Sequence, residues 1–365
     1  MNKKTSVINN ILTLALTIGA LFGVVLLCNS KYSAEILDVV LYFLAGAVVF
    51  GLINAFVHEW GHILAGKKNG FKFVSMTIWF FKWTKIRKRI QFDFVMMGEE
   101  AGSSEMITDY TDGIAKRFKK MTMGGIVASG IMMLVSITPL FLWSILPLWA
   151  YCLLGMMLPV SAYYFFGNAL PMASEGVLND GATVRGINKD TPSLKVMLSV
   201  LSIQAELTSG KSPAEIDEQF YFEVPQLPED DLNFILLLNA RYAYYLDKGD
   251  TEKAKATIDR LMSLLDYMPK SYQVVIKTDA LYNACTFDYN EETADELMYE
   301  VEKYVNNVNN ATNVRVKLAY LIYVAKKKDA CDVFYEKGLR ECKRCPVLGL
   351  AKMEQKLFDK LKKDF

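Results

Sequence analysis

The sequence predicts a mainly α-helical protein with a polytopic membrane domain and a second helical domain outside the bilayer. Long apolar runs fill the N-terminal half, whereas charged residues become frequent after Asn188. The chain is 52% hydrophobic but also 22% charged, which is too many charges for a protein buried wholly in lipid. We therefore expect residues 1–190 to form the membrane domain and residues 191–365 to form a cytosolic domain.

The first apolar run, residues 11–28, follows a short basic start at residues 1–4. Both a cleaved signal peptide and a retained transmembrane helix begin in this way. The run is about long enough to span a bilayer, and no clean small-x-small cleavage site follows it. We therefore expect a retained transmembrane helix.

Two further apolar stretches supply the remaining spans. Residues 36–57 form the second run, and residues 121–174 contain no Lys, Arg, Asp or Glu. The latter stretch is long enough for two spans of about 20 residues each, with Pro147 at the turn between them. Pro139 and Pro159 lie within these spans and are expected to kink their helices. The sequence thus predicts about four transmembrane helices.

Basic residues are concentrated in one loop. Residues 67–120 contain twelve Lys and Arg, whereas the connection after the first span has only Lys31. The positive-inside rule then places this loop and both termini in the cytoplasm. We expect a multi-pass protein of the cell (plasma) membrane. The formal net charge of +1 gives no global basic signal for nucleic acid.

The basic loop also contains a predicted β-hairpin. Residues 71–81 are rich in aromatic and β-branched types, apolar residues alternate over residues 86–94, and residues 82–89 read as a basic turn. One interpretation is a small cytoplasmic sheet that covers the helices. The other is an edge strand at residues 71–81 that pairs with an unwound peptide. The sequence leaves both open.

The second apolar run leads directly into Val57-His58-Glu59-Trp60-Gly61-His62, which holds both histidines of the chain. Positions i and i+4 share a helix face, so His58 and His62 can bind one metal ion while Glu59 reaches an activated water. Two ordinary core histidines are the alternative. A Glu at membrane depth is costly and marks a functional position, so we expect a zinc site with Glu59 as its catalytic residue.

A catalytic zinc site usually has three protein ligands, so one more is required. Glu175 and Asp180 are the candidates near membrane depth. Pro171 is expected to end the fourth span, and Gly181 lets the backbone come close after Asp180. Periodicity alone does not choose between the two carboxylates.

Three motifs together carry a resemblance to a known family: His58-Glu59-Trp60-Gly61-His62, Asn168-x-x-Pro171 and Asp180-Gly181. They resemble the site-2 protease family of intramembrane zinc metalloproteases, over about residues 41–186. The resemblance implies that His58, His62 and Asp180 are the zinc ligands. It also implies that Glu59 is the general base and that Asn168 helps to hold the substrate backbone near the metal.

A small-residue stretch at residues 124–129 resembles another part of that family, which usually reads Gly-Pro-x-x-Asn. Here Ile126 stands in place of Pro and Ser129 in place of Asn. The resemblance therefore gives little support for a polar role of Ser129.

In the second half, apolar residues recur at helical spacing. They predict helices at residues 192–209, 233–247 and 251–265, the last two antiparallel around Gly249. Further helix pairs can be drawn through residues 284–305 and 318–338.

One helix pair has residues near the pattern of a tetratricopeptide repeat: Tyr245, Gly249, Ala254 and Pro269. We therefore expect a helical-hairpin, tetratricopeptide-like domain, with an irregular helical domain as the alternative. Because such arrays hold peptides or proteins on a concave face, a protein partner is expected there.

These observations predict a zinc-dependent metalloendopeptidase that cleaves in or next to a transmembrane segment of a membrane protein or peptide precursor, in regulated proteolysis or signalling. Its expected partners are this substrate and the lipid bilayer, and no nucleic acid. Two alternatives remain open: a non-catalytic membrane scaffold whose helical domain docks partners, and a membrane-tethered protease of exported leader peptides.

Overall fold

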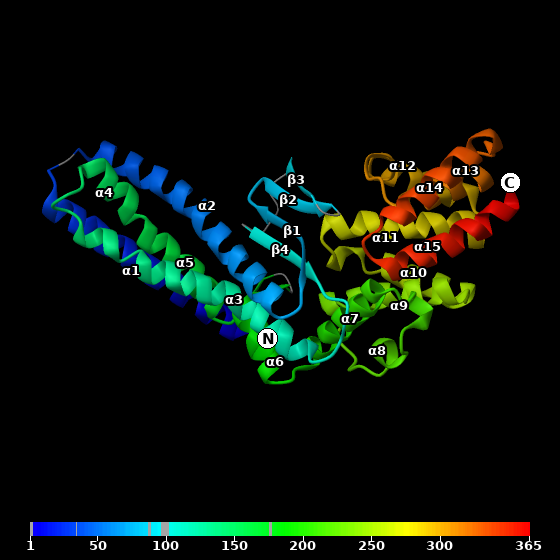
Figure 1. The fold of residues 1–365 in the computed structure, drawn as a ribbon, viewed down its shortest axis with the longest axis horizontal. Coiled ribbons are helices and arrows are strands. Elements are labelled where there is room, and N and C mark those ends of the chain that lie inside the picture. The colour runs from blue at the N-terminus through cyan, green and yellow to red at the C-terminus, as the bar shows by residue number, and fades with distance from the viewer. Residues whose placement is uncertain (1–2, 34, 87–88, 96–101, 175–176) are drawn as a thin grey trace. The chain divides into compact units, whose positions relative to one another are not determined.

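The computed structural model describes residues 3–33, 35–86, 89–95, 102–174 and 177–365. The chain is mainly helical with a small antiparallel sheet (Figure 1). It divides into two compact units. The first comprises residues 1–107 and 115–190, and the second comprises residues 108–114 and 191–365.

The first unit is built on six helices: α1 (Lys3–Lys31), α2 (Ile36–Lys68), α3 (Ile114–Val135), α4 (Leu148–Gly155), α5 (Met157–Ala169) and α6 (Asp180–Asn188). Within the described residues, four segments are long and apolar enough to cross a membrane, namely 4–31, 37–68, 114–141 and 148–169. Large apolar side chains are exposed along them, including Ile8 at 63% and Leu37 at 67%. Lipid rather than water is the environment in which such a surface is stable.

The three prolines in the apolar region act differently. Pro147 precedes α4 at the predicted turn. Pro159 has no N–H for the carbonyl of Gly155, and the chain breaks between α4 and α5 at Met156. Pro139 likewise has no N–H for the carbonyl of Val135, where α3 ends, and it lies in a short 3-10 helix that continues the same apolar segment.

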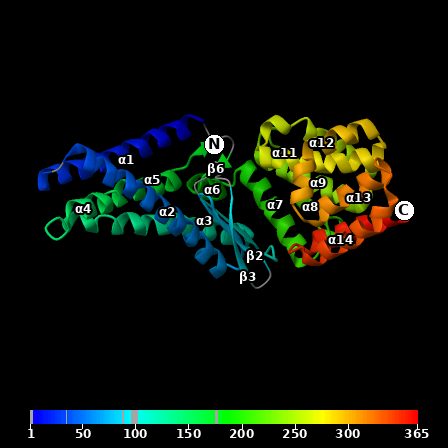
Figure 2. The ribbon, with the colours of Figure 1, turned by 90° about the horizontal axis from the view of Figure 1, so that it is seen from above.

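Helix α1 packs along α5, and the two lie side by side in Figure 1 and Figure 2. Near the other end of α1, Cys28 Sγ is 3.4 Å from Cys152 Sγ of α4. Both thiols are buried. The N-terminal helix is therefore an integral part of this unit's packing.

The sheet has four antiparallel strands: β1 (Lys72–Ile78), β2 (Phe81–Ile86), β3 (Arg89–Phe94) and β4 (Gly102–Ile107), in the order β3-β2-β1-β4. Met76 and Ile78 of β1 pack with Ala55 and Ile63 of α2 in one buried cluster. The sheet thus covers one side of α2, in agreement with the first interpretation of the hairpin.

The prediction that residues 71–81 form an edge strand is wrong, because β1 is paired on both sides, with β2 and with β4. The predicted turn at residues 82–89 is too long, because most of it belongs to strand β2. The chain reverses first at Trp79 (φ 53°), so that residues 81–86 are a strand, and β2 then pairs antiparallel with β3 from Ile86 opposite Arg89, within the predicted region. A left-handed conformation is uncommon for a bulky residue, so no residue pattern indicated the turn at Trp79.

Nine α-helices follow in the second unit: α7 (Pro192–Ser209), α8 (Gln219–Phe222), α9 (Leu232–Lys248), α10 (Thr251–Met262), α11 (Lys270–Asn283), α12 (Glu291–Asn307), α13 (Ala311–Tyr323), α14 (Cys331–Arg344) and α15 (Leu348–Leu361). The helices predicted at residues 192–209, 233–247 and 251–265 are present, with small differences at their ends. Gly249 (φ 78°) ends α9, and Asp250 caps α10 by accepting a hydrogen bond from the backbone N–H of Lys253.

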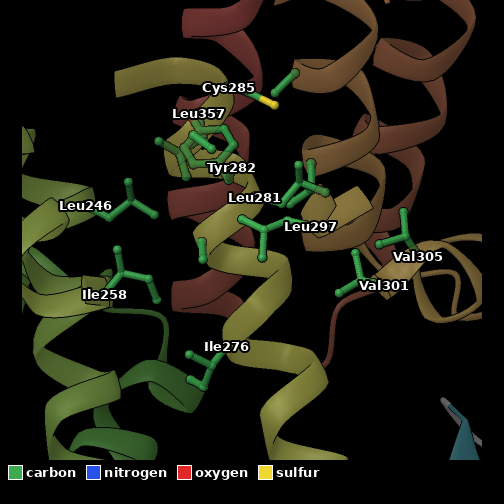
Figure 3. Packing of buried hydrophobic residues seen from close by; sticks show 14 of the residues in the cluster. Leu246, Ile258, Ile276, Leu281, Tyr282, Cys285, Leu297, Val301, Val305 and Leu357 are labelled. Atoms are coloured by element: carbon green, nitrogen blue, oxygen red, sulfur yellow. The ribbon is translucent and has the colours of Figure 1, made fainter. Parts of the chain in front are cut away.

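Consecutive helices of this unit pack in pairs, α9 with α10, α11 with α12, and α13 with α14. Figure 3 shows the shared core, in which Leu246, Ile258, Leu281 and Leu297 come from four different helices. The pairs drawn through residues 284–305 and 318–338 have the wrong ends, since α11 begins at Lys270 and α13 at Ala311. The tetratricopeptide-like character of the array stays a prediction.

Candidate metal centre

His58, Glu59 and His62 lie within α2, which continues past them to Lys68. All three side chains are buried. The four-residue spacing places both imidazoles on one face of the helix, with His58 Nε2 3.1 Å from His62 Nε2. The two nitrogen atoms are therefore close enough to bind a single ion.

Asp180, the first residue of α6, completes the group. Its Oδ2 atom is 3.2 Å from His58 Nε2 and 3.1 Å from His62 Nε2. Within the described ranges, these three residues are the one cluster of His, Cys, Asp or Glu that could hold a metal ion. Glu175, the other candidate ligand, lies outside the described residues. The structure thus brings together the three residues that the resemblance implied as ligands.

The spacing of these three atoms fits a zinc ion. Zinc binds such ligands at about 2.0–2.1 Å in a tetrahedron, which separates neighbouring ligands by about 3.3 Å. The three ligand atoms stand 3.1–3.2 Å apart. Asp180 Oδ2 is also buried and forms no hydrogen bond of acceptable geometry with any described residue. A buried carboxylate oxygen and two imidazole nitrogens that converge on one point form a donor set that a bound cation would stabilise.

Helix α3 fixes the orientation of both imidazoles through contacts with their Nδ1 atoms. His62 Nδ1 is 3.0 Å from the carbonyl oxygen of Met121, and His58 Nδ1 is 2.9 Å from Ser129 Oγ. A carbonyl only accepts, so Nδ1 of His62 donates the hydrogen bond and Nε2 keeps its lone pair for a metal. The family resemblance gave little support for a polar role of Ser129. Its contact with His58 depends on how α3 packs against α2.

Glycines make this packing possible. A Cβ at Gly125 of α3 would stand 2.3 Å from His62 Nε2 and 2.8 Å from His58 Cε1. Gly61 of α2 and Gly124 of α3 face each other so closely that a Cβ on either would lie within 2.5 Å of the other's carbonyl oxygen. The small-residue stretch therefore lets α3 approach the imidazoles.

Electrostatics favour an ionised Asp180. Burial acts to raise the pKa of its carboxyl, but the two neighbouring imidazoles outweigh this effect and hold the pKa below its usual value. A carboxylate must be ionised to serve as a metal ligand, so Asp180 is in the required form at neutral pH.

Asn179 was not singled out from the sequence, although an Asn before a helix is a typical N-cap. Its Oδ1 accepts hydrogen bonds of 2.9 Å from the backbone N–H groups of Ala182 and Met172. Its Nδ2 donates to the carbonyls of Gly167 at 2.6 Å and Leu170 at 2.7 Å. Asn179 therefore links the end of α5 to the start of α6, directly beside Asp180.

The other two predicted residues lie nearby in the fold. Glu59 is 6% exposed, and a Cβ at Gly102 would be 3.0 Å from its Oε1, so the start of β4 lies against the Glu59 carboxylate. Asn168 is on α5, where its Nδ2 donates to the carbonyl of Tyr164 at 2.9 Å. Its predicted contact with a substrate backbone stays a prediction.

Comparisons of the chain with protein families, with curated proteins and with solved structures found no match. The functional argument therefore depends on the residues and geometry of the centre itself.

Proposed function

We propose that this chain is an intramembrane zinc metalloprotease resembling the site-2 proteases, which hydrolyses a peptide bond in or next to a transmembrane segment. One observation carries the proposal. His58, His62 and Asp180, from two helices far apart in the sequence, direct three ligand atoms to one buried point, and Glu59 is next to the first of them. A purely structural metal site would have no use for that Glu.

The proposed chemistry divides between the ion and the chain. A zinc ion in this centre would supply Lewis-acid chemistry that activates water and polarises a carbonyl. The Glu59 carboxylate accepts the proton of the attacking water and returns it to the amine nitrogen that leaves. Ser129 and the Met121 carbonyl keep the imidazoles oriented. Glu59 and the three ligands are buried or nearly so, which limits the access of bulk water.

The proposed substrate is an unwound segment, because a helix hides its carbonyls in hydrogen bonds. The outermost strand β4 begins at Gly102, against Glu59. We therefore propose that β4, rather than residues 71–81, is the edge at which an extended chain adds to the sheet.

The test compares membranes that contain the wild-type protein with membranes that contain Glu59→Gln. We expect the variant to keep stoichiometric zinc, because its ligands are intact, and to lose proteolysis. A membrane-protein fragment present with the wild type should disappear as its precursor accumulates. Absence of zinc from the wild-type protein, or full cleavage by the variant, would refute the proposed mechanism.

A further inference from the structure

The chain must return from α5 to the metal centre through an irregular segment. After α5 ends at Ala169, it passes through β5 (Ala173–Ser174) and β6 (Val177–Leu178) and reaches Asn179. Strands of two residues fix little by themselves. The position of Asp180 therefore depends on what else holds this segment.

Two polar side chains of α1 hold it. Ser6 Oγ donates to the carbonyl of Ala173 at 2.9 Å and accepts from the N–H of Ala173 at 3.0 Å. Asn9 Nδ2 donates to the carbonyl of Pro171 at 2.7 Å. Ser6 and Asn9 are three residues apart and so share one face of α1. They join the first helix to residues more than 160 positions away in the sequence.

Asn179 holds Met172, the residue between Pro171 and Ala173, because its Oδ1 accepts a hydrogen bond from the backbone N–H of Met172. Pro171, Met172 and Ala173 are thus each bound by one of three side chains. The same Asn179 caps α6 immediately before Asp180. Hydrogen bonds and the backbone of residues 171–173 therefore link α1 to Asn179, the residue immediately before Asp180.

Interhelical hydrogen bonds matter more to how helices pack in lipid than in water. Lipid tails are as apolar as the helix surfaces, so van der Waals packing and interhelical hydrogen bonds, rather than the hydrophobic effect, fix how helices pack. The hydrogen bonds of Ser6 and Asn9 therefore help to hold the segment before Asp180.

We propose that Ser6, Asn9 and Asn179 are positioning residues of the metal centre, and that α1 is an integral part of the metal-binding enzyme. This inference rests on the proposed zinc centre and goes beyond it. Ser6, Asn9 and Asn179 are neither the three proposed ligands nor the proposed general base.

The test measures Co²⁺ affinity and the visible absorption of bound Co²⁺ in the full-length protein in detergent. Ser6→Ala, Asn9→Ala and the double variant should bind Co²⁺ about 10- to 100-fold more weakly, as residues that support metal ligands do. Their spectra should also change, because Asp180 is displaced. Ser6→Thr should restore binding, since its hydroxyl can make the same contacts. Asn10→Ala, at an exposed neighbouring position on α1, is the matched control.

Asn179→Ser is a further variant, since Ser can cap α6 but lacks the NH₂ group that bonds Gly167 and Leu170. We expect weaker Co²⁺ binding with the fold retained. Wild-type affinity and spectrum in the Ser6/Asn9 double variant would overturn the inference and leave the zinc centre intact. Failure of the wild-type protein to bind Co²⁺ or Zn²⁺ would refute the centre itself, which separates the two proposals.

Discussion

Ser129 Oγ lies 2.9 Å from His58 Nδ1, on the side of the imidazole away from Asp180. With the Met121 carbonyl at His62 Nδ1, this contact makes α3 the support of the centre, although α3 supplies none of its three candidate ligands. Partners of this kind fix the tautomer and orientation of a metal-binding histidine.

Replacing Ser129 by Ala should weaken zinc binding about 10-fold or more, because His58 loses its hydrogen-bond partner. Competition with a chelator of known affinity measures this change in the purified protein. Ser136→Ala is the control, because that buried hydroxyl donates to Met133 in its own turn. Equal zinc affinity in Ser129→Ala and wild type would show that the contact does not orient His58.

Gly125→Ala should reduce zinc binding more strongly. Its Cβ would stand 2.3 Å from His62 Nε2, a separation that side chains do not tolerate, so α3 or the imidazole must move. Zinc content after dialysis against a metal buffer measures the loss. Gly23→Ala on α1 is the control, because a Cβ there has no atom within 4 Å. Unchanged zinc content in Gly125→Ala would contradict the close packing of α3 on the imidazoles.

Much of the centre could be predicted from sequence because its signals are local. The i,i+4 spacing of His58 and His62 fixes a shared helix face whatever the tertiary fold. Pro147 marked a turn for the equally local reason that proline lacks an N–H. Asp180 needed the family resemblance, since spacing alone left Glu175 as an alternative.

The remaining features depend on contacts between distant residues. The alternation in residues 71–94 indicates strands but not their order, so it left open whether residues 71–81 form an edge strand, and the structure makes β1 internal. Ser6 and Asn9 are unremarkable polar residues at a helix start, and only the position of Pro171 and Ala173 beside them gives them a role. Ser129 likewise acquires a role only from the packing of α3 against α2.

Oxidation should join Cys28 to Cys152. Their sulfur atoms are 3.4 Å apart, so forming a bond of about 2.05 Å needs little movement. Diamide, which takes up the two hydrogens of the thiols, should produce an intramolecular disulfide that non-reducing peptide mapping detects. Cys28→Ser should abolish that peptide. If both thiols react with an alkylating reagent but diamide never joins them, α1 does not pack on α4 as described.

The second unit contains a largely buried acid whose titration should be measurable. Asp279 Oδ1 is 3.5 Å from Arg315 Nη2, and Arg315 Nε is 2.7 Å from Glu354 Oε2. Burial raises the pKa of Asp279 to about 6, because desolvation and the Glu354 charge outweigh the attraction of Arg315. The folded state therefore binds this proton more tightly than the unfolded state, whose Asp has a pKa of about 3.9. The stabilisation of the folded state by this tighter proton binding is lost as the pH rises from about 4 through about 6.

Asp279→Asn should remove this pH dependence. Relative to wild type, the variant should gain about 1 kcal/mol in free energy of unfolding between pH 5 and pH 7.5, because the Asn needs no ionisation in the core. The buried thiol of Cys285 reports on this unit, and its labelling in urea, pulsed at one fixed pH, gives the unfolding midpoint. Asp259→Asn, at an exposed position, is the control. If the difference between Asp279→Asn and wild type is the same at both pH values, then Asp279 does not titrate in this range and Arg315 keeps it ionised.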